Sequence, residues 1–167
     1  MSTNKEQDQS APKEPLQVLL ADDDRDDREL FEDALNETGV QAELTTVNDG
    51  QELIDHLKDP SIPDPDILFV DINMPVKSGD KAVAEIKADP DLKNIPTVML
   101  STSDTPDVVE KSFKAGADLY VQKPSSYRNF VKLLQNVFAF HWAGRLLRTA
   151  WNRFFVNEKQ FSHKDSK

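Results

Sequence analysis

Cysteine is absent from the 167-residue sequence, which excludes a disulfide framework and any chemistry that needs a thiolate. The sequence also lacks a hydrophobic run long enough to cross a bilayer, so no membrane-spanning helix is expected. Its first residues, Met1 to Pro15, are polar and contain no hydrophobic core of a signal peptide. We therefore expect a cytoplasmic protein.

Positive charge is scarce in most of the chain. The formal net charge is −10, yet residues 141–167 hold six basic and two acidic residues, a net of +4, which leaves −14 for residues 1–140. This acidic body argues against general binding of nucleic acid, whose phosphates attract basic surfaces. It suits the capture of cations or of a basic partner, although a solvated acidic surface is the preferred explanation for most of these charges.

Length and composition favour one globular domain with an appendage. Hydrophobic residues make up 38% of the chain and charged residues 30%, and the length is sufficient for a substantial core. No internal repeat is visible. We divide the chain into a disordered lead over residues 1–15, a domain over residues 16–140 and a C-terminal helical extension with its tail over residues 141–167.

Short hydrophobic runs alternate with amphipathic stretches along the proposed domain. The runs predict strands at Val18–Ala21, Ala42–Val47, Ile67–Asp71, Thr97–Ser101 and Leu119–Gln122. The amphipathic stretches predict helices at Asp27–Glu37, Gln51–Lys58, Lys81–Ala88, Pro106–Ala115 and from about Tyr127 to Phe140. Strict alternation of this kind indicates an α/β fold with a parallel sheet and right-handed crossovers.

At this size the flavodoxin-like, doubly wound (βα)5 arrangement with strand order 2-1-3-4-5 is the expected topology. Ligands in such sheets bind at the carboxyl ends of the strands, near the point where the strand order reverses. Polar side chains follow these strand ends in the sequence: Asp22, Asp23, Asp71, Ser101 and Lys123. All five should therefore meet at one edge of the sheet.

Converging carboxylates repel each other, and a hard divalent cation relieves that repulsion. We expect Mg²⁺, with Asp23 and Asp71 as direct ligands, Asp22 bound through water, and the backbone carbonyl of Asn73 as a further ligand. The carboxylate of Asp71 is the candidate nucleophile, because it can attack phosphorus and form an acyl phosphate.

The remaining two residues suit the same chemistry. Lys123 would offset negative charge on the phosphoryl oxygens, and the hydroxyl of Ser101 would donate a hydrogen bond to one of them. Taken alone, each residue also has a structural explanation, as a turn aspartate, a helix cap, a loop serine or an exposed lysine. Their joint occurrence at ordered strand ends favours a functional site.

The chain resembles a bacterial response-regulator receiver domain of the CheY-like, single-domain type over about residues 16–140. The matching motifs are Leu19-Leu20-Ala21-Asp22-Asp23-Asp24, Val70-Asp71-Ile72-Asn73-Met74-Pro75 with Gly79, Ser101 after the fourth strand, and Tyr120-Val121-Gln122-Lys123-Pro124. The spacing agrees too, with 30 positions from Asp71 to Ser101 and 22 from Ser101 to Lys123.

The resemblance implies a role for each motif residue. Asp71 would be the phosphoacceptor, with Asp22, Asp23 and the carbonyl of Asn73 completing the Mg²⁺ site. Ser101 would be the switch hydroxyl.

Two further roles come from the last motif. Tyr120 would be the switch aromatic, which turns inward when Ser101 engages the phosphate. Lys123 would pair with the phosphate, and the resemblance implies a cis bond between Lys123 and Pro124, which proline makes energetically modest.

These roles imply a single-domain response regulator of a two-component phosphorelay. It would receive a phosphoryl group from a histidine kinase, catalyse only its own phosphorylation and dephosphorylation, and act on a downstream protein or phosphotransfer protein. Residues 85–96 also resemble small regulators that serve bacterial phytochrome kinases, which points to a phytochrome-type kinase as the partner. Neither nucleic acid nor a membrane is an expected partner.

Two other functions compete with this interpretation. One is a Mg²⁺-dependent phosphatase or phosphotransferase that turns over a small molecule through an aspartyl phosphate. Enzymes resembling the haloacid-dehalogenase family usually carry a second aspartate two positions after the nucleophile, where this chain has Asn73, and they need a cap that no segment here supplies. The other is an inert interaction module, against which the complete acidic set weighs.

The segment after the expected last helix is unusually aromatic. Its hydrophobic residues are Phe138, Phe140, Trp142, Leu146, Leu147, Trp151, Phe154 and Phe155, with Arg145, Arg148 and Arg153 among them. Nothing in it resembles a helix-turn-helix output domain. A homodimer through this segment is expected first, because so many exposed aromatic residues would be a liability. Folding back onto the domain and binding a membrane surface are the alternatives.

Overall fold

The computed structural model describes residues 14–144, 146, 147 and 149–159. The expected disordered lead lies almost wholly outside the described residues, as do Arg145, Arg148 and the end of the expected tail.

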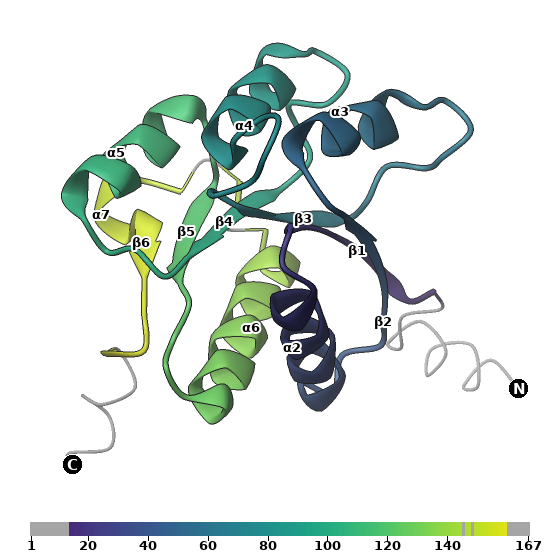
Figure 1. The fold of residues 1–167 in the computed structure, drawn as a ribbon. Coiled ribbons are helices and arrows are strands. Elements are labelled where there is room, and N and C mark those ends of the chain that lie inside the picture. Colours follow the sequence, from purple (N-terminus) through teal and green to yellow (C-terminus); the bar gives the residue numbers. More distant parts are fainter. Residues whose placement is uncertain (1–13, 145, 148, 160–167) are drawn as a thin grey trace, which may run out of the picture.

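A parallel sheet of six strands forms the centre of the described chain (Figure 1). The strands are β1 (Leu16–Ala21), β2 (Ala42–Val47), β3 (Ile67–Asp71), β4 (Thr97–Ser101), β5 (Leu119–Gln122) and β6 (Phe155–Val156). Their order across the sheet is β2-β1-β3-β4-β5-β6, so the predicted flavodoxin-like order of the first five strands is confirmed. The sixth strand was not predicted.

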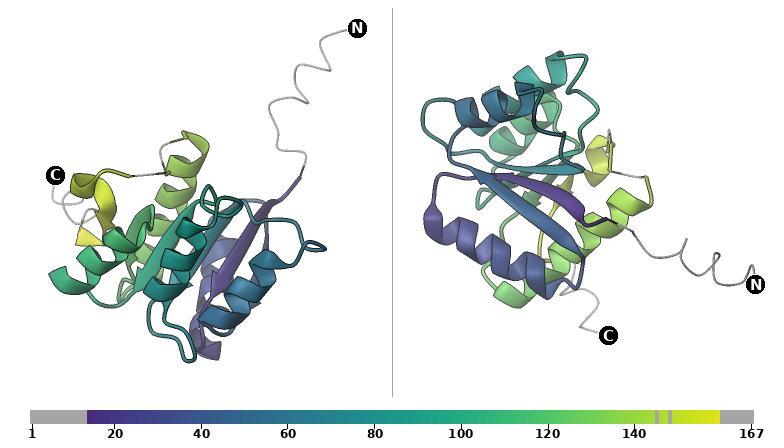
Figure 2. Two further views of the ribbon diagram at one scale, coloured as in Figure 1. Left: turned by 90° about the horizontal axis from the view of Figure 1, so that it is seen from above. Right: turned by 90° about the vertical axis from the view of Figure 1, so that its right-hand side faces the viewer.

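Helices cover both faces of the sheet, as the predicted alternation requires. The helices are α2 (Arg25–Glu37), α3 (Gly50–Lys58), α4 (Gly79–Ala88), α5 (Pro106–Ala115), α6 (Tyr127–Trp142) and the short α7 (Trp151–Phe154). α2 and α6 lie on one face, whereas α3, α4 and α5 lie on the other (Figures 1 and 2). No helix in the described ranges is long and apolar enough to cross a membrane.

Local side-chain chemistry sets the helix boundaries. The carboxylate of Asp24 accepts a hydrogen bond from the amide of Asp27 at the start of α2, and the Ser126 hydroxyl accepts one from the amide of Asn129 at the start of α6. α5 begins at Pro106 and ends before Gly116, whose φ of +102° is the left-handed conformation that glycine adopts readily.

Alternate residues of each central strand enter two separate cores. Leu20, Phe69 and Leu100 pack toward α2 and α6, whereas Leu19, Val70 and Met99 pack toward α3, α4 and α5. Because both faces are covered, the strands read as continuous hydrophobic runs, and a polar residue appears only where a strand leaves the core. This pattern explains why the strand ends could be located from the sequence.

The C-terminal extension differs from the expected helical one. α6 ends at Trp142, Gly144 has a φ of +70°, and the chain then returns through α7 to form β6 beside β5. An edge strand leaves backbone groups unpaired, and β6 pairs with Tyr120 and Val121 of β5. Sheet pairing therefore takes the place of the expected longer helix. Leu146 and Val156 are buried among the α2–α6 core residues of the same chain.

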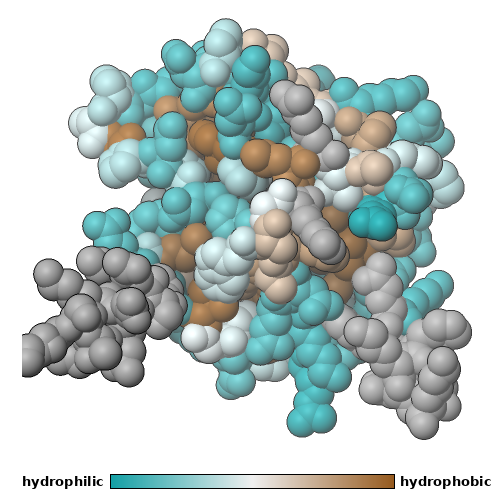
Figure 3. All heavy atoms as spheres, turned by 180° about the vertical axis from the view of Figure 1, so that it is seen from behind, coloured by the Kyte–Doolittle hydropathy of each residue, from teal (hydrophilic) through white to brown (hydrophobic). Residues whose placement is uncertain are grey.

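The folded-back segment buries only part of its aromatic surface. Trp151 remains 53% exposed and Trp142 57% exposed, while Phe154 is fully buried. Figure 3 shows hydrophobic surface in the middle of the face opposite to that of Figure 1. The arrangement supports the fold-back alternative for the described part of this segment. The domain of the same chain is sufficient to bury Phe154.

Candidate functional site

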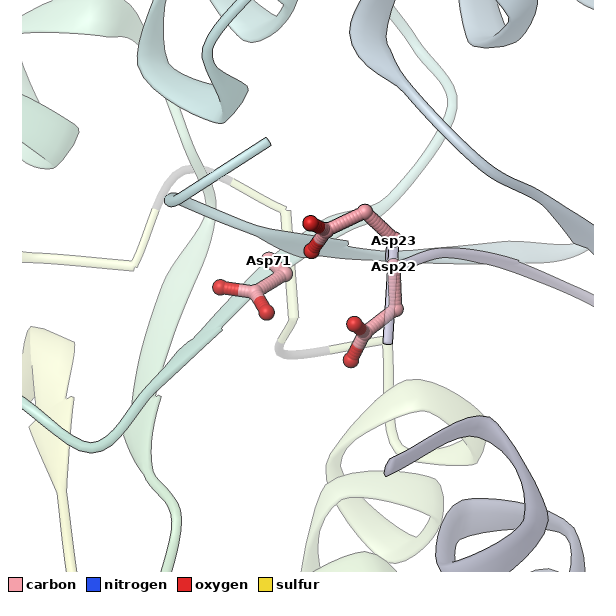
Figure 4. A group of neighbouring side chains, drawn as sticks. All are labelled: Asp22, Asp23 and Asp71. Atoms are coloured by element: carbon pink, nitrogen blue, oxygen red, sulfur yellow. The ribbon is translucent and has the colours of Figure 1, made fainter. Parts of the chain in front are cut away.

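Three carboxylates gather at the carboxyl ends of β1 and β3. Ala21 and Val70 are register partners in the sheet, so Asp22 and Asp71 leave neighbouring strands at the same level. Ligand oxygens of Asp22, Asp23 and Asp71 all lie within 4.8 Å of one another (Figure 4). The sequence-predicted convergence of these residues is therefore present in the structure.

Burial makes the carboxyl group of Asp22 harder to ionise. Asp22 is only 2% exposed, and this burial is the main cause that raises the pKa of its carboxyl group from 3.8 to about 6. A hydrogen bond from the amide of Asp24 to Oδ1 and the nearby charge of Lys123 act in the opposite direction, while the charge of Asp71 raises the pKa further. The Asp24 amide and Lys123 therefore do not fully offset the cost of ionising the buried Asp22 carboxyl group.

Lys123 reaches into the acidic group from the loop after β5. Its Nζ atom lies 3.3 Å from Oδ2 of Asp22, 3.4 Å from Oδ2 of Asp27 and 3.5 Å from Oδ2 of Asp71. Burial opposes charge on the lysine, but the carboxylates of Asp71, Asp22 and Asp27 outweigh it and raise the pKa of Lys123. The side chain is therefore a cation held at the centre of the site.

The loop after β3 fixes the carboxylate of Asp71. The amide of Asn73 donates a hydrogen bond of 3.2 Å to Oδ1 of Asp71, and the amide of Gly79 donates to the carbonyl of Ile72. A β-carbon at position 79 would overlap the carbonyl oxygen of Asp71. Gly79 thus permits α4 to begin directly against the backbone of Asp71, and Asn73 lies in the loop between them.

Ser101 and Tyr120 are linked through Ser103. Ser101 follows Leu100, the register partner of Asp71, and is 2% exposed. Its Oγ atom accepts a hydrogen bond of 3.1 Å from the amide of Ser103, and the hydroxyl of Tyr120 donates one of 2.8 Å to the carbonyl of Ser103. Tyr120 is completely buried, which is the main reason that the pKa of its hydroxyl is raised.

The expected cis bond between Lys123 and Pro124 is wrong for this structure, because the described residues contain no cis peptide bond. A bond before proline favours trans by only about 0.5–1 kcal/mol, so the sequence is compatible with either isomer. The trans bond leaves Lys123 within reach of the carboxylates, and the amide of Lys123 donates to the carbonyl of Ser101.

Two contacts of the site were not predicted from the sequence. Asp27 supplies a third carboxylate to Lys123 from the first turn of α2, and its position five residues after Asp22 is the signal that could have indicated it. Phe154 packs against Tyr120 from the C-terminal segment, with ring centroids 6.2 Å apart. No local pattern connects Phe154 to Tyr120, since they meet only through the pairing of β6 with β5.

The donor set fits a hard divalent cation. Carboxylate oxygens are the ligands that Mg²⁺ prefers, and Asp23 is exposed, which leaves room for water or a further oxygen ligand. Within the described ranges this is the one group of three or more acidic, histidine or cysteine residues that could hold a metal ion. A carboxylate between a partly buried lysine and such a cation is also arranged to accept a phosphoryl group.

Comparison with known proteins agrees with this geometry. The model of the response regulator receiver domain family matches residues 18–135. Response regulator Rcp1 of Synechocystis is 32% identical over 137 residues, covering 80% of this chain and 92% of the relative.

Solved structures show the same likeness. The phosphorylated cyanobacterial phytochrome response regulator RcpA has a TM-score of 0.71 at 30% identity, covering 78% of this chain and 96% of that one. The Mn²⁺-bound form of Rcp1 has a TM-score of 0.68 at 32% identity, covering 75% and 94%. From its sequence, its sheet and its acidic site together, the chain belongs to the response regulator receiver domain family.

Proposed function

We propose that this protein is a response regulator that accepts a phosphoryl group from a histidine kinase on Asp71. The observation that carries the proposal is the position of Lys123, whose Nζ atom lies within 3.5 Å of the carboxylates of both Asp71 and Asp22 at the carboxyl edge of the sheet. A partly buried cation facing a nucleophilic carboxylate is suited to a reaction that adds negative charge there.

The reaction forms one bond and breaks another. A carboxylate oxygen of Asp71 attacks the phosphorus of phosphohistidine, an O–P bond forms, and the P–N bond breaks with its electron pair returning to the imidazole of the donor. Lys123 offsets charge on the phosphoryl oxygens, while the amide of Asn73 holds Asp71 in place. The hydroxyl of Ser101 donates a hydrogen bond to one phosphoryl oxygen.

Asp22, Asp23, Asp71 and the carbonyl of Asn73 would hold the Mg²⁺ ion. When bound, the ion supplies positive charge that neutralises the phosphoryl oxygens and aligns them with Asp71. The oxygen-only donor set and the raised pKa of Asp22 support this assignment, because a carboxylate that is costly to ionise alone gains from a cation beside it.

The proposed kinase partner is of the phytochrome type. This rests on the likeness to RcpA, described as a phytochrome response regulator, and to Rcp1. Output passes to a downstream protein or phosphotransfer protein, and the chain has no catalytic activity beyond its own phosphorylation and dephosphorylation. A homodimer through the C-terminal segment, a cytoplasmic location and the lack of nucleic-acid or membrane partners stay predictions.

A small-molecule phosphatase is the less favoured function. The position two residues after Asp71 is Asn73, which cannot act as the general acid that such an enzyme needs. The match to the receiver domain family and the likeness to response regulator Rcp1 also favour the receiver function.

Binding of beryllofluoride, an analogue of the phosphoryl group, tests the proposal. In the presence of Mg²⁺ the intact protein should bind it in a saturable way, and Asp71→Asn should abolish binding. Asp64→Asn, at an exposed aspartate of the loop before β3, is the matched control and should bind as the unchanged protein does. Equal binding by Asp71→Asn and the unchanged protein would contradict the assignment of the phosphoacceptor.

A further inference from the structure

The C-terminal segment covers Tyr120 with two aromatic rings. The ring centroid of Tyr120 lies 6.2 Å from that of Phe154 and 5.7 Å from that of Phe155. Phe154 also packs edge-to-face on Phe113 of α5, with centroids 5.1 Å apart. Tyr120 and Phe154 are both fully buried, so the segment fills one wall of the cavity that would otherwise surround the tyrosine.

Backbone pairing and side-chain hydrogen bonds hold the segment in place at these rings and beyond them. β6 pairs with β5 in register, with Phe155 opposite Tyr120. Beyond the strand, the carboxylate of Glu158 accepts hydrogen bonds from the amide of Ser125 at 2.9 Å and from Nδ2 of Asn129 at 3.2 Å. The segment is therefore bound by both an apolar and a polar surface of the domain.

Tyr120 connects this segment to the phosphoryl site. Its hydroxyl donates to the carbonyl of Ser103, and the amide of Ser103 donates to Oγ of Ser101. The side chain of Ser101 also makes a hydrogen bond with the Tyr120 hydroxyl, so Tyr120 contacts Ser101 directly as well as through Ser103. The docked segment thus packs against Tyr120, Tyr120 bonds to Ser103, and Ser103 orients the hydroxyl of Ser101, the last residue of β4.

We propose that Phe154 is a positioning residue of the phosphoryl site, acting through Tyr120 and Ser103 on Ser101, so that docking of the C-terminal segment raises the affinity of Asp71 for a phosphoryl group. The physical reason is preorganisation, since a hydroxyl that is already oriented loses less freedom when it binds the phosphoryl oxygen. The inference rests on the proposed function and adds a regulator of the same site.

Linkage makes this coupling reciprocal. If the docked segment strengthens binding at Asp71 by some factor, then occupation of Asp71 strengthens docking of the segment by the same factor. Phosphorylation would thereby hold β6 more tightly against β5, and a partner that competes for the edge of β5 would weaken the phosphorylated state.

The test compares beryllofluoride affinity in the presence of Mg²⁺ among variants of the full chain. Phe154→Leu should weaken binding about fivefold, the lower end of typical coupling between sites. Leu57→Ala, which truncates a buried side chain of α3, a helix that packs beside α4, controls for lost packing and should leave the affinity unchanged. Unchanged affinity in Phe154→Leu would overturn the proposal.

A double-mutant cycle identifies the route. Tyr120→Phe removes the hydroxyl that bonds to Ser103, so Phe154→Leu should have no additional effect on affinity in that background. An equal effect in both backgrounds would show that Phe154 does not act through the Tyr120 hydroxyl, and would overturn the proposed route.

Hydrogen exchange on the unchanged protein gives an independent measurement if a variant fails to fold. Beryllofluoride with Mg²⁺ should slow exchange of the backbone amides of Phe155 and Val156 by about the fivefold factor expected for the affinity. Exchange that is unchanged or faster would contradict the coupling.

The experiments distinguish an error in the proposed function from an error in the proposed coupling. Absence of beryllofluoride binding to the unchanged protein refutes the proposed function, whereas normal binding without coupling refutes only the role of Phe154.

Discussion

The Nζ atom of Lys123 lies 3.5 Å from Oδ2 of Asp71, although 52 positions separate the two residues in sequence. The contact exists because β3 and β5 both end at the same edge of a parallel sheet, with β4 between them. It places the only described ammonium group within salt-bridge distance of Asp71 in the interior of the site. The strand-end aspartate is thus balanced by a lysine that the fold supplies from far along the chain.

Replacing this lysine should weaken the site without abolishing the fold. In Lys123→Met the carboxylates of Asp22, Asp27 and Asp71 lose their shared cation, and a bound phosphoryl analogue loses a charge-assisted partner. We expect at least about a tenfold loss of beryllofluoride affinity, which corresponds to about 1.4 kcal/mol. Titration in the presence of Mg²⁺ measures it, and Lys93→Met, at an exposed lysine, should retain normal affinity.

The stability of the metal-free protein should depend on pH through Asp22. Its pKa is about 6 in the folded protein against an ordinary value of 3.8, so between these values the folded state binds more protons than the unfolded chain. The free energy of unfolding should therefore fall as pH rises from about 4 to about 6. Lys123, whose pKa is raised above its ordinary value, stays charged throughout this window.

Asp22→Asn provides the matching variant for this pH dependence. The amide cannot ionise, so the variant should be more stable than the unchanged protein at pH 7 without metal, by about 3 kcal/mol. Chemical denaturation at several pH values measures both curves. A variant whose stability falls between pH 4 and 6 as steeply as that of the unchanged protein would show that Asp22 is not the titrating group.

Substitution of Gly79 should disturb Asp71 through the backbone. A β-carbon there would overlap the Asp71 carbonyl, so Gly79→Ala forces the start of α4 away from β3. We expect Gly79→Ala to lower both stability and Mg²⁺-dependent beryllofluoride binding. Gly39→Ala is the contrast, because a β-carbon at that position would meet no atom within 4 Å and only its φ of +81° is unfavourable, at a cost of about 1–2 kcal/mol. It should leave binding unchanged.

Val76 adopts a conformation that its side chain disfavours. Its φ is +66°, and the amide of Lys77 donates to the carbonyl of Pro75 across it, which forms a tight turn with one residue at its centre. A β-branched residue is strained there, and its side chain is 82% exposed. Val76→Gly should therefore stabilise the protein by about 1 kcal/mol, as measured by thermal or chemical denaturation. A clear loss of stability would contradict the assignment of strain.

Much of the fold was predictable because both faces of its sheet are buried. Each central strand is a hydrophobic run, and a polar residue marks its end or follows it directly. This pattern locates Asp22, Asp71 and Ser101 at strand ends from the sequence alone. The parallel order then required these ends to meet. The convergence of the acidic residues with Lys123 follows from topology alone.

Other features depended on contacts that leave no local signal. β6 is only two residues long, Phe155–Val156, and its pairing with β5 is decided by the open edge of the sheet rather than by any periodic pattern. The contact of Asp27 with Lys123 depends on the turn that starts α2. The isomer of the bond before Pro124 is decided by a small energy difference, which sequence reasoning cannot resolve.

Chemical location of the phosphoryl group tests the central claim most directly. After incubation with a small-molecule phosphodonor and Mg²⁺, reduction with borohydride converts an aspartyl phosphate to homoserine, which mass spectrometry locates in the sequence. We predict conversion at Asp71 alone, dependent on Mg²⁺ and absent from the Asp71→Asn variant. Conversion at another aspartate, or none in the unchanged protein under conditions where it binds Mg²⁺, would contradict the assignment of Asp71 as the phosphoacceptor.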